Sequence, residues 1–154
     1  MLDDLYREVI MDHYKRPRNR GGLDEADVVV EGVNPLCGDQ IKLWLDIDGD
    51  RIIDARFEGH GCSISQASVS MMTEAIKGRP ISDVNTIVED FRGMMLGGAA
   101  ADGDKLGELV ALEGVKQFPV RIKCAVLGWN TLQLGLTERD KAPGGHVELK
   151  HSEA

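Results

Sequence analysis

The chain has 154 residues, 42% of them hydrophobic and 29% charged, and a formal net charge of −8 at pH 7. This length and composition predict one soluble domain that folds around a core of its own. The acidic balance argues against nucleic acid as a partner, because non-specific binding to phosphates rests on cationic contacts, and no stretch reaches the roughly 20 apolar residues that a membrane span needs.

The amino-terminal part of the chain predicts one helix and two strands. Apolar residues recur at helical spacing from Leu2 to His13, and Pro17 ends that helix. Residues 28–33 predict a short strand. Residues 40–48 alternate between apolar and polar side chains, which is the pattern of a strand with one buried face.

A turn at residues 48–50 then predicts a hairpin with a return strand. Ile53, Ala55 and Phe57 alternate with polar residues on this return strand. Because the apolar faces of the two strands must match, Leu45 lies opposite either Ile53 or Ala55, and both registers stay open.

The carboxy-terminal half predicts helices. They lie at residues 63–77, from residue 83, at 106–114, and from Pro119 onward. Ser63 and Gln66 fit a capping box for the first of these helices, although Ser65 is an alternative cap.

The order of helix, strands and helices predicts an α+β fold with an antiparallel sheet. We expect a single domain over residues 1–140. From residue 141 the chain turns polar, and residues 141–154 predict a flexible carboxy-terminal tail.

The chain contains three cysteines, Cys37, Cys62 and Cys124, whose thiols could bind a metal or react as nucleophiles. The chain begins Met-Leu-Asp-Asp, acidic where a secretory leader is basic, so we expect a cytoplasmic protein. In that reducing compartment an odd number of cysteines does not predict disulfides. Each thiol is therefore either a small buried hydrophobe or a group that is used chemically.

The predicted hairpin brings two of these thiols together. Extending either register beyond the strand ends places Cys62 opposite a residue next to Cys37, on strands about 4.8 Å apart. Asp39 lies two residues from Cys37, so in an extended chain both side chains point to the same side. Strict alternation directs Cys62 to the other face, and we therefore expect Gly59 and Gly61 to let the chain bend inward.

A metal ion would explain this grouping. Cys37 occupies a turn bounded by proline and glycine, and Cys62 precedes a helix N-terminus, whose dipole favours a thiolate. Cys124 adds a third sulfur if the last helix lies on the apolar face of the sheet near Cys37. Thiolates with the Asp39 carboxylate favour zinc or an iron–sulfur cluster over magnesium or calcium. His60 is an alternative fourth ligand, although its position between two glycines is typical of an exposed loop.

Other polar and sulfur-bearing residues have structural interpretations. His13 follows an apolar stripe and is expected to pack against the core or lie on the surface. Lys116, Arg121 and Lys123 predict a solvated basic rim, and as an alternative they could contact an anion or a partner. Four methionines at helical spacing, at positions 71, 72, 94 and 95, are expected in the core.

Five stretches of the chain carry a family resemblance. They are DHYKRPRN at 12–19, NPLCGD at 34–39, DARFEGHGCSIS at 54–65, KG at 77–78 and FPVRIKC at 118–124. In these stretches the chain resembles the SufU branch of the IscU/NifU-type iron–sulfur cluster assembly proteins. Two features favour the SufU branch: Lys123 stands where scaffold members usually carry histidine, and the stretch between Cys62 and Cys124 is longer than in those scaffolds.

The resemblance implies a small three-stranded antiparallel sheet packed against several helices. It also implies one zinc ion held by Cys37, Asp39, Cys62 and Cys124. The implied function is that of a zinc-dependent sulfurtransferase, in which Cys37 is the catalytic thiol. Cys37 would accept persulfide sulfur from a SufS-type cysteine desulfurase, one of whose histidines would take a place at the zinc, and pass the sulfur to downstream scaffold or acceptor proteins.

Two other functions stay open on the sequence. The first is a scaffold on which iron and sulfide form a [2Fe–2S] cluster for transfer, which the absence of histidine at Lys123 disfavours. The second is a structural zinc-binding module without chemistry, in which all four ligands would only stabilise the fold.

Overall fold

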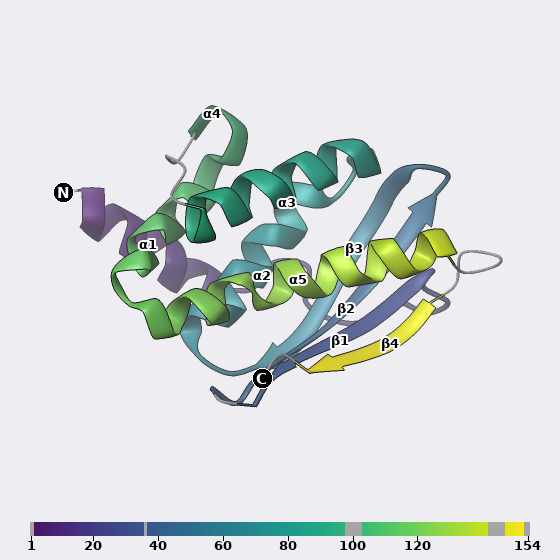
Figure 1. Cartoon of the computed structure of the whole chain (residues 1–154), viewed down its shortest axis with the longest axis horizontal. Helices are drawn as coiled ribbons and strands as arrows, with labels where there is room; N and C mark the ends of the chain where they lie inside the picture. Colours follow the sequence, from purple (N-terminus) through teal and green to yellow (C-terminus); the bar gives the residue numbers. More distant parts are fainter. Residues whose placement is uncertain (1, 36, 98–102, 142–146, 153–154) are drawn as a thin grey trace.

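The computed structural model describes residues 2–35, 37–97, 103–141 and 147–152, and this part of the chain forms one sheet with helices packed against it (Figure 1). The elements in chain order are α1 (Leu2–Lys15), β1 (Val28–Asn34), β2 (Asp39–Asp48), β3 (Arg51–His60), α2 (Ser63–Ile76), α3 (Ile81–Leu96), α4 (Gly103–Leu106), the 3-10 helix η1 (Gly107–Gln117), α5 (Pro119–Lys141) and β4 (Val147–Ser152).

The strands form a single sheet in the order β3-β2-β1-β4. β1, β2 and β3 are antiparallel neighbours, and β4 runs parallel to β1. The predicted α+β fold with three antiparallel strands is therefore confirmed. Leu45 lies opposite Ala55, which decides between the two registers that the sequence left open.

A β-bulge near the hairpin turn changes which residues of β3 face the core. The pairing shifts by one residue between Asp46 and Ile47. As a result Ile52 is buried, whereas Ile53 is 47% exposed. The prediction that Ile53 shares a buried face with Ala55 is wrong, because one extra residue in a strand reverses the alternation of its side chains.

The helices gather on one face of the sheet, where α5 lies along β1 and β2 and α2 packs against β3 (Figure 1). Small side chains let α2 and α5 approach closely. The Ser68 hydroxyl donates a hydrogen bond to the Ala125 carbonyl at 2.6 Å, and the Trp129 indole N–H donates to Ser68 Oγ at 3.1 Å. Trp129 also stacks on Phe91 of α3 with 4.4 Å between ring centroids. These contacts with α2 and α3 set the position of α5, and therefore of Cys124, relative to the sheet.

The stretch 12–19 ties α1 to the rest of the domain. His13 is 2% exposed, and its ring nitrogens lie 2.8 Å from Ser70 Oγ on α2 and 2.8 Å from Glu108 Oε2 on η1. The backbone N–H of Arg18 donates to the same Ser70 hydroxyl at 2.9 Å. The packing role that the sequence allowed for His13 is therefore confirmed.

The segment before α5 differs from its prediction. Instead of one short α-helix over 106–114, the chain forms α4 and then η1. Gly107, at the junction, has a φ of +57°, a left-handed conformation that glycine adopts readily and that ends an α-helix.

The end of the chain adds a strand to the sheet. Residues 142–146 of the expected polar tail lie outside the described residues, but Val147–Ser152 form β4 along the free edge of β1. This strand covers backbone groups that β1 would otherwise expose. The predicted domain boundary and the flexibility of the tail stay predictions. In the part of the chain described, no helix combines the length and the apolar character needed to cross a membrane.

Candidate metal centre

The turn between β1 and β2 presents the first thiol. Asn34 ends β1 and pairs directly with Asp39, which begins β2. The Asn34 carbonyl accepts hydrogen bonds from the backbone N–H groups of Cys37 at 3.3 Å and Gly38 at 2.9 Å. Gly38 has a φ of +73°, which favours glycine. Cys37 is half-buried, whereas Asp39 and Cys124 are fully buried.

The carboxylate of Asp39 is fully buried beside the end of β3. Its Oδ1 accepts a hydrogen bond from the backbone N–H of Cys62 at 2.8 Å. This approach requires Gly61, because a Cβ there would collide with Oδ1 and lie 2.9 Å from the Asp39 Cα. Gly61 has a φ of +141°, so the bend that the sequence required at this position is confirmed.

Cys62 itself caps the N-terminus of α2, which corrects the prediction that Ser63 begins a capping box. Its Sγ accepts the backbone N–H of Ser65 at 3.4 Å, and the Ser65 hydroxyl donates to the Cys62 carbonyl at 3.1 Å. Sulfur can take this place because the first N–H groups of an α-helix have no partner within the helix and need an acceptor from outside it. The same Sγ lies 3.8 Å from Oδ2 of Asp39.

The third thiol comes from α5 and is fully buried. Burial raises the pKa of the Cys124 thiol, and hydrogen bonding to Asp39, Cys62 and Cys37 raises it further. These partners belong to the start of β2, the cap of α2 and the turn after β1. Cys124 thus lies where three separate segments meet, and the expectation that the last helix covers the sheet near Cys37 is confirmed.

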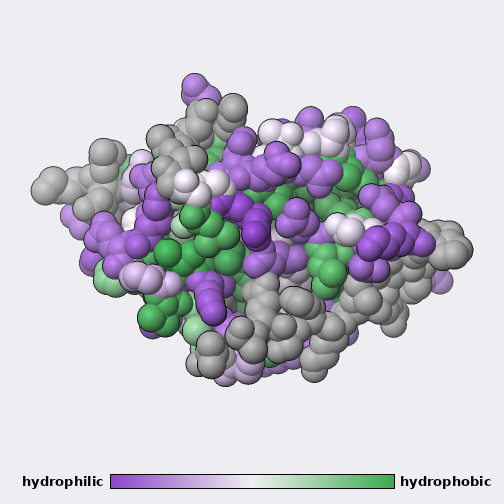
Figure 2. Space-filling model, in the orientation of Figure 1, coloured by the Kyte–Doolittle hydropathy of each residue, from purple (hydrophilic) through white to green (hydrophobic). Residues whose placement is uncertain are grey.

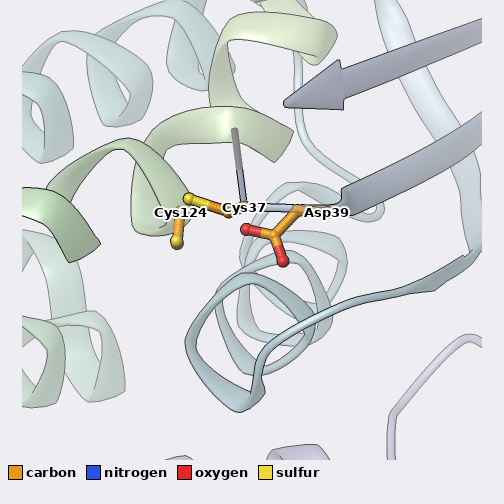
Figure 3. Close-up of side chains that lie close together, drawn as sticks. All are labelled: Cys37, Asp39 and Cys124. Atoms are coloured by element: carbon orange, nitrogen blue, oxygen red, sulfur yellow. The ribbon is translucent and has the colours of Figure 1, made fainter. Parts of the chain in front are cut away.

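Three of the four predicted ligand residues converge on a common point (Figure 3). The Sγ atoms of Cys37 and Cys124 and a carboxylate oxygen of Asp39 all lie within 4.8 Å of one another. Ligand atoms around tetrahedral zinc are roughly 3.3–3.8 Å apart, given bonds of about 2.3 Å to sulfur and 2.0–2.2 Å to oxygen. Cys62 is outside this closest group but borders it through Asp39 and Cys124. A small inward shift would make the donor set suitable for one zinc ion.

Other predicted candidates lie around this centre rather than in it. His60 is exposed at the end of β3, and Lys123 is exposed on α5. Among the described residues, the group able to hold a metal contains no histidine. Arg121 lies near the sulfurs of the centre, and the negative charges of Cys62 and Cys124 raise the pKa of its guanidinium.

A groove of about 1000 Å³ opens beside Cys62. Its walls come from α1, the start of α2 and the start of α5, and include Met11, Tyr14, Ile64, Phe118, Val120 and Arg121. Phe118 and Val120 are 61% and 73% exposed, unusually much for apolar side chains. Figure 2 shows hydrophobic surface over the part of this face where α5 begins. Apolar surface of this kind beside a reactive centre is typical of a contact with another protein.

Sequence reasoning missed one residue of the centre, Asn34. Its side chain is fully buried, and Nδ2 donates a hydrogen bond to Cys37 Sγ at 3.6 Å. A signal for it was present, because Val28 and Val30 mark the inward positions of β1 and Asn34 continues the same alternation. A polar residue at an inward position of a strand predicts a specific hydrogen bond.

Comparisons with known proteins agree with this geometry. Residues 5–138 match the family described as the NifU-like N terminal domain. The chain is 52% identical over 139 residues to the zinc-dependent sulfurtransferase SufU of Bacillus subtilis, with 90% of this chain and 94% of that protein covered. It is 43% identical over 132 residues to the iron–sulfur cluster assembly scaffold protein IscU of Streptococcus pyogenes, with coverage of 86% and 82%.

A solved structure shares the fold. It is a crystal structure from Fervidobacterium islandicum AW-1, described as an iron–sulfur cluster assembly scaffold protein for the SUF system. The two chains superimpose with a TM-score of 0.80 at 41% identity, and the match covers 84% of this chain and 94% of the other. The resemblance to the SufU branch that the sequence motifs indicated is therefore confirmed.

Proposed function

The chain belongs to the family of NifU-like N terminal domains, and from this premise we propose that it is a zinc-dependent sulfur carrier of iron–sulfur cluster assembly. The observation that carries the proposal is the convergence of Cys37, Asp39 and Cys124 within 4.8 Å, with Cys37 half-buried in a turn. The 52% identity to a protein named as a zinc-dependent sulfurtransferase supports the same function.

The proposed zinc ligands are Cys37, Asp39, Cys62 and Cys124. Asp39 would bind through Oδ2, because Oδ1 already accepts the backbone N–H of Cys62. A bound zinc ion would supply the positive charge that keeps the buried thiols ionised and would restrain the nucleophilicity of Cys37. Its charge would also offset the cost of placing Asp39 and Cys124 together, both fully buried, in a site of low dielectric constant.

Sulfur transfer would proceed by attack of the Cys37 thiolate on the outer sulfur of a persulfide held by a partner protein. A new bond forms between Cys37 Sγ and that sulfur, while the sulfur–sulfur bond of the donor breaks and its electron pair leaves with the partner's thiolate. No oxidant or reductant is consumed, because one persulfide replaces another. The turn position of Cys37 gives it the reach that this exchange needs, whereas Cys124 remains enclosed.

The partner that fits this chemistry is a SufS-type cysteine desulfurase. We propose that it contacts the groove beside Cys62, where exposed Phe118 and Val120 offer apolar surface and Arg121 offers charge. Downstream acceptors would then take the sulfur from Cys37.

A turnover assay tests the proposal. Zinc-loaded protein is mixed with a cysteine desulfurase and free cysteine, and both the rate and the mass of the carrier are measured. We expect faster turnover and a carrier that is heavier by one sulfur atom on Cys37. Cys37→Ser should abolish both effects while the circular dichroism spectrum stays native. Full stimulation by Cys37→Ser would refute the sulfur-carrier function.

The cluster scaffold is the second candidate, since two relatives with that name are 43% and 39% identical to this chain. It predicts a stable, transferable [2Fe–2S] cluster after anaerobic reconstitution. Exposed Lys123 in the place of a ligand histidine argues against such a cluster. A purely structural zinc site predicts instead that Cys37 resists alkylation even when the desulfurase is present.

A further inference from the structure

A buried carboxamide lies against the thiol that would react. Asn34 is fully buried, and its Nδ2 donates to Cys37 Sγ at 3.6 Å. The Asn34 carbonyl also accepts the backbone N–H groups of Cys37 and Gly38. One residue therefore holds both the backbone and the sulfur of Cys37.

Asn34 occupies an inward position of β1. It continues the alternation of the inward-facing Val28 and Val30, both of which are apolar. A buried carboxamide is costly unless its hydrogen bonds are made. The bond to sulfur thus has a use that offsets the burial of a polar group.

The cysteines that accept N–H groups do so in different ways. Cys62 accepts a backbone N–H from Ser65 at the fixed end of α2. Cys37 lies in a turn, and its donor is a side chain. An N–H donor draws electron density from a thiolate, which stabilises the free anion and weakens its bond to a metal.

We infer that Asn34 is a positioning residue for Cys37. Its N–H···S hydrogen bond keeps the sulfur turned toward Asp39 and Cys124, and it lowers the donor strength of that sulfur toward the metal. Because Cys37 also lies in a turn rather than at the end of a helix, it is the ligand that is released for attack on a persulfide. The consequence for sulfur transfer rests on the proposed function, whereas the hydrogen bond is a property of this chain alone.

Two measurements on the metal-loaded protein test the hydrogen bond. In the cadmium-113 form, the Asn34 side-chain protons should show scalar coupling to the metal through the Cys37 sulfur. In the cobalt(II) form, Asn34→Ala should move the sulfur-to-metal charge-transfer band to lower energy, because the sulfur becomes richer in electrons. Asn34→Ser, which keeps a donor, should move the band back toward its original position.

Val33→Ala is the matched control, because Val33 lies next to Asn34 in β1 but at an outward, half-buried position. Val33→Ala should lower the stability of β1 without changing the energy of the sulfur-to-metal charge-transfer band. The absence of coupling in the natural protein, or an unchanged band in fully loaded Asn34→Ala, would overturn the inference. If Asn34→Ala does not fold, the coupling in the natural protein decides. Coupling without any acceptance of sulfur from a desulfurase would instead overturn the proposed function and leave the hydrogen bond standing.

Discussion

Replacing Gly61 with alanine tests whether the backbone of β3 positions the buried carboxylate. Gly61 has a φ of +141°, and a Cβ there would lie 2.9 Å from the Asp39 Cα and collide with its Oδ1. The variant must therefore push Asp39 away or break the hydrogen bond from the Cys62 N–H. Either change moves a proposed ligand out of the metal centre.

The size of the effect follows from two contributions. A left-handed backbone costs a residue with a Cβ roughly 1–2 kcal/mol. Loss of a hydrogen bond to a charged group adds about 1.5–3 kcal/mol, so Gly61→Ala should lower the free energy of unfolding by roughly 2.5–5 kcal/mol. Gly38→Ala is the matched control, because Gly38 also has a positive φ, of +73°, but a Cβ there would meet no atom within 4 Å. It should lose only the backbone contribution.

Urea unfolding in the presence of a chelator measures the stability of both variants, and competition with a chromophoric chelator measures their zinc affinity. Zinc affinity should fall about 10- to 100-fold more in Gly61→Ala than in Gly38→Ala. Equal losses of stability and of zinc affinity in the two variants would refute the reasoning, since they would show that only backbone strain matters here.

Two further substitutions test the charge of the hairpin and the groove. Burial and a hydrogen bond to Asp27 raise the pKa of Asp46. The ionised carboxylate therefore opposes folding once the pH exceeds about 3.9, the ordinary pKa of an aspartate in the unfolded chain. Asp46→Asn should therefore raise the free energy of unfolding at pH 7 by up to about 1 kcal/mol and change it little at pH 3. Thermal unfolding at both pH values would measure this difference. An equal gain in the free energy of unfolding at both pH values would contradict the proposed cause. Val120→Asp should leave the fold intact, because Val120 is 73% exposed, but should raise the concentration of carrier needed for half-maximal desulfurase turnover. The control Ile53→Asp, at a residue 47% exposed on the distant hairpin, should leave that concentration unchanged; an equal effect of both substitutions would exclude the groove as the contact surface.

The sheet could be predicted because its signals are local. Alternation in 40–48 and a turn at 48–50 fix β2, β3 and their pairing to within two registers. The bulge that exposes Ile53 could not be predicted, since nothing in the alternation of a single strand reveals an extra residue in its pairing. The same limit applies at Gly107, where one left-handed residue divides a predicted helix into α4 and η1.

The candidate site was predictable in part from the residues themselves. The hairpin places Cys62 near Cys37 whatever the register, and the glycine at position 61 indicates where the chain can bend. The approach of Cys124 depends on contacts between α2 and α5, such as that of Ser68 with Ala125, which are distant in sequence. The residues alone add Cys124 to the set only on the condition that the last helix lies near Cys37, whereas the family resemblance implies Cys124 without that condition.

The role of Cys62 as a helix cap was missed for a different reason. Serine is a far commoner N-cap than cysteine, so Ser63 was the natural choice from the sequence. The structure shows that the sulfur that caps α2 also lies 3.8 Å from Oδ2 of Asp39, at the border of the candidate metal centre. A cysteine sulfur can accept an N–H of the first helical turn, and the usual cap preferences for Ser, Thr, Asp and Asn do not include this case.

The three cysteines differ in how strongly the surrounding structure restrains them, and this difference distinguishes a sulfur carrier from a structural zinc site. Cys124 lies in the core helix beneath the Ser68–Trp129 contact, and Cys62 is fixed by the first turn of α2. Cys37 belongs to a turn between two strands, and it is half-buried. A site whose only task is to stabilise the fold gains by enclosing all of its ligands equally. Under the proposed function, two firm sulfurs and a buried carboxylate can retain the metal while the third sulfur leaves to react.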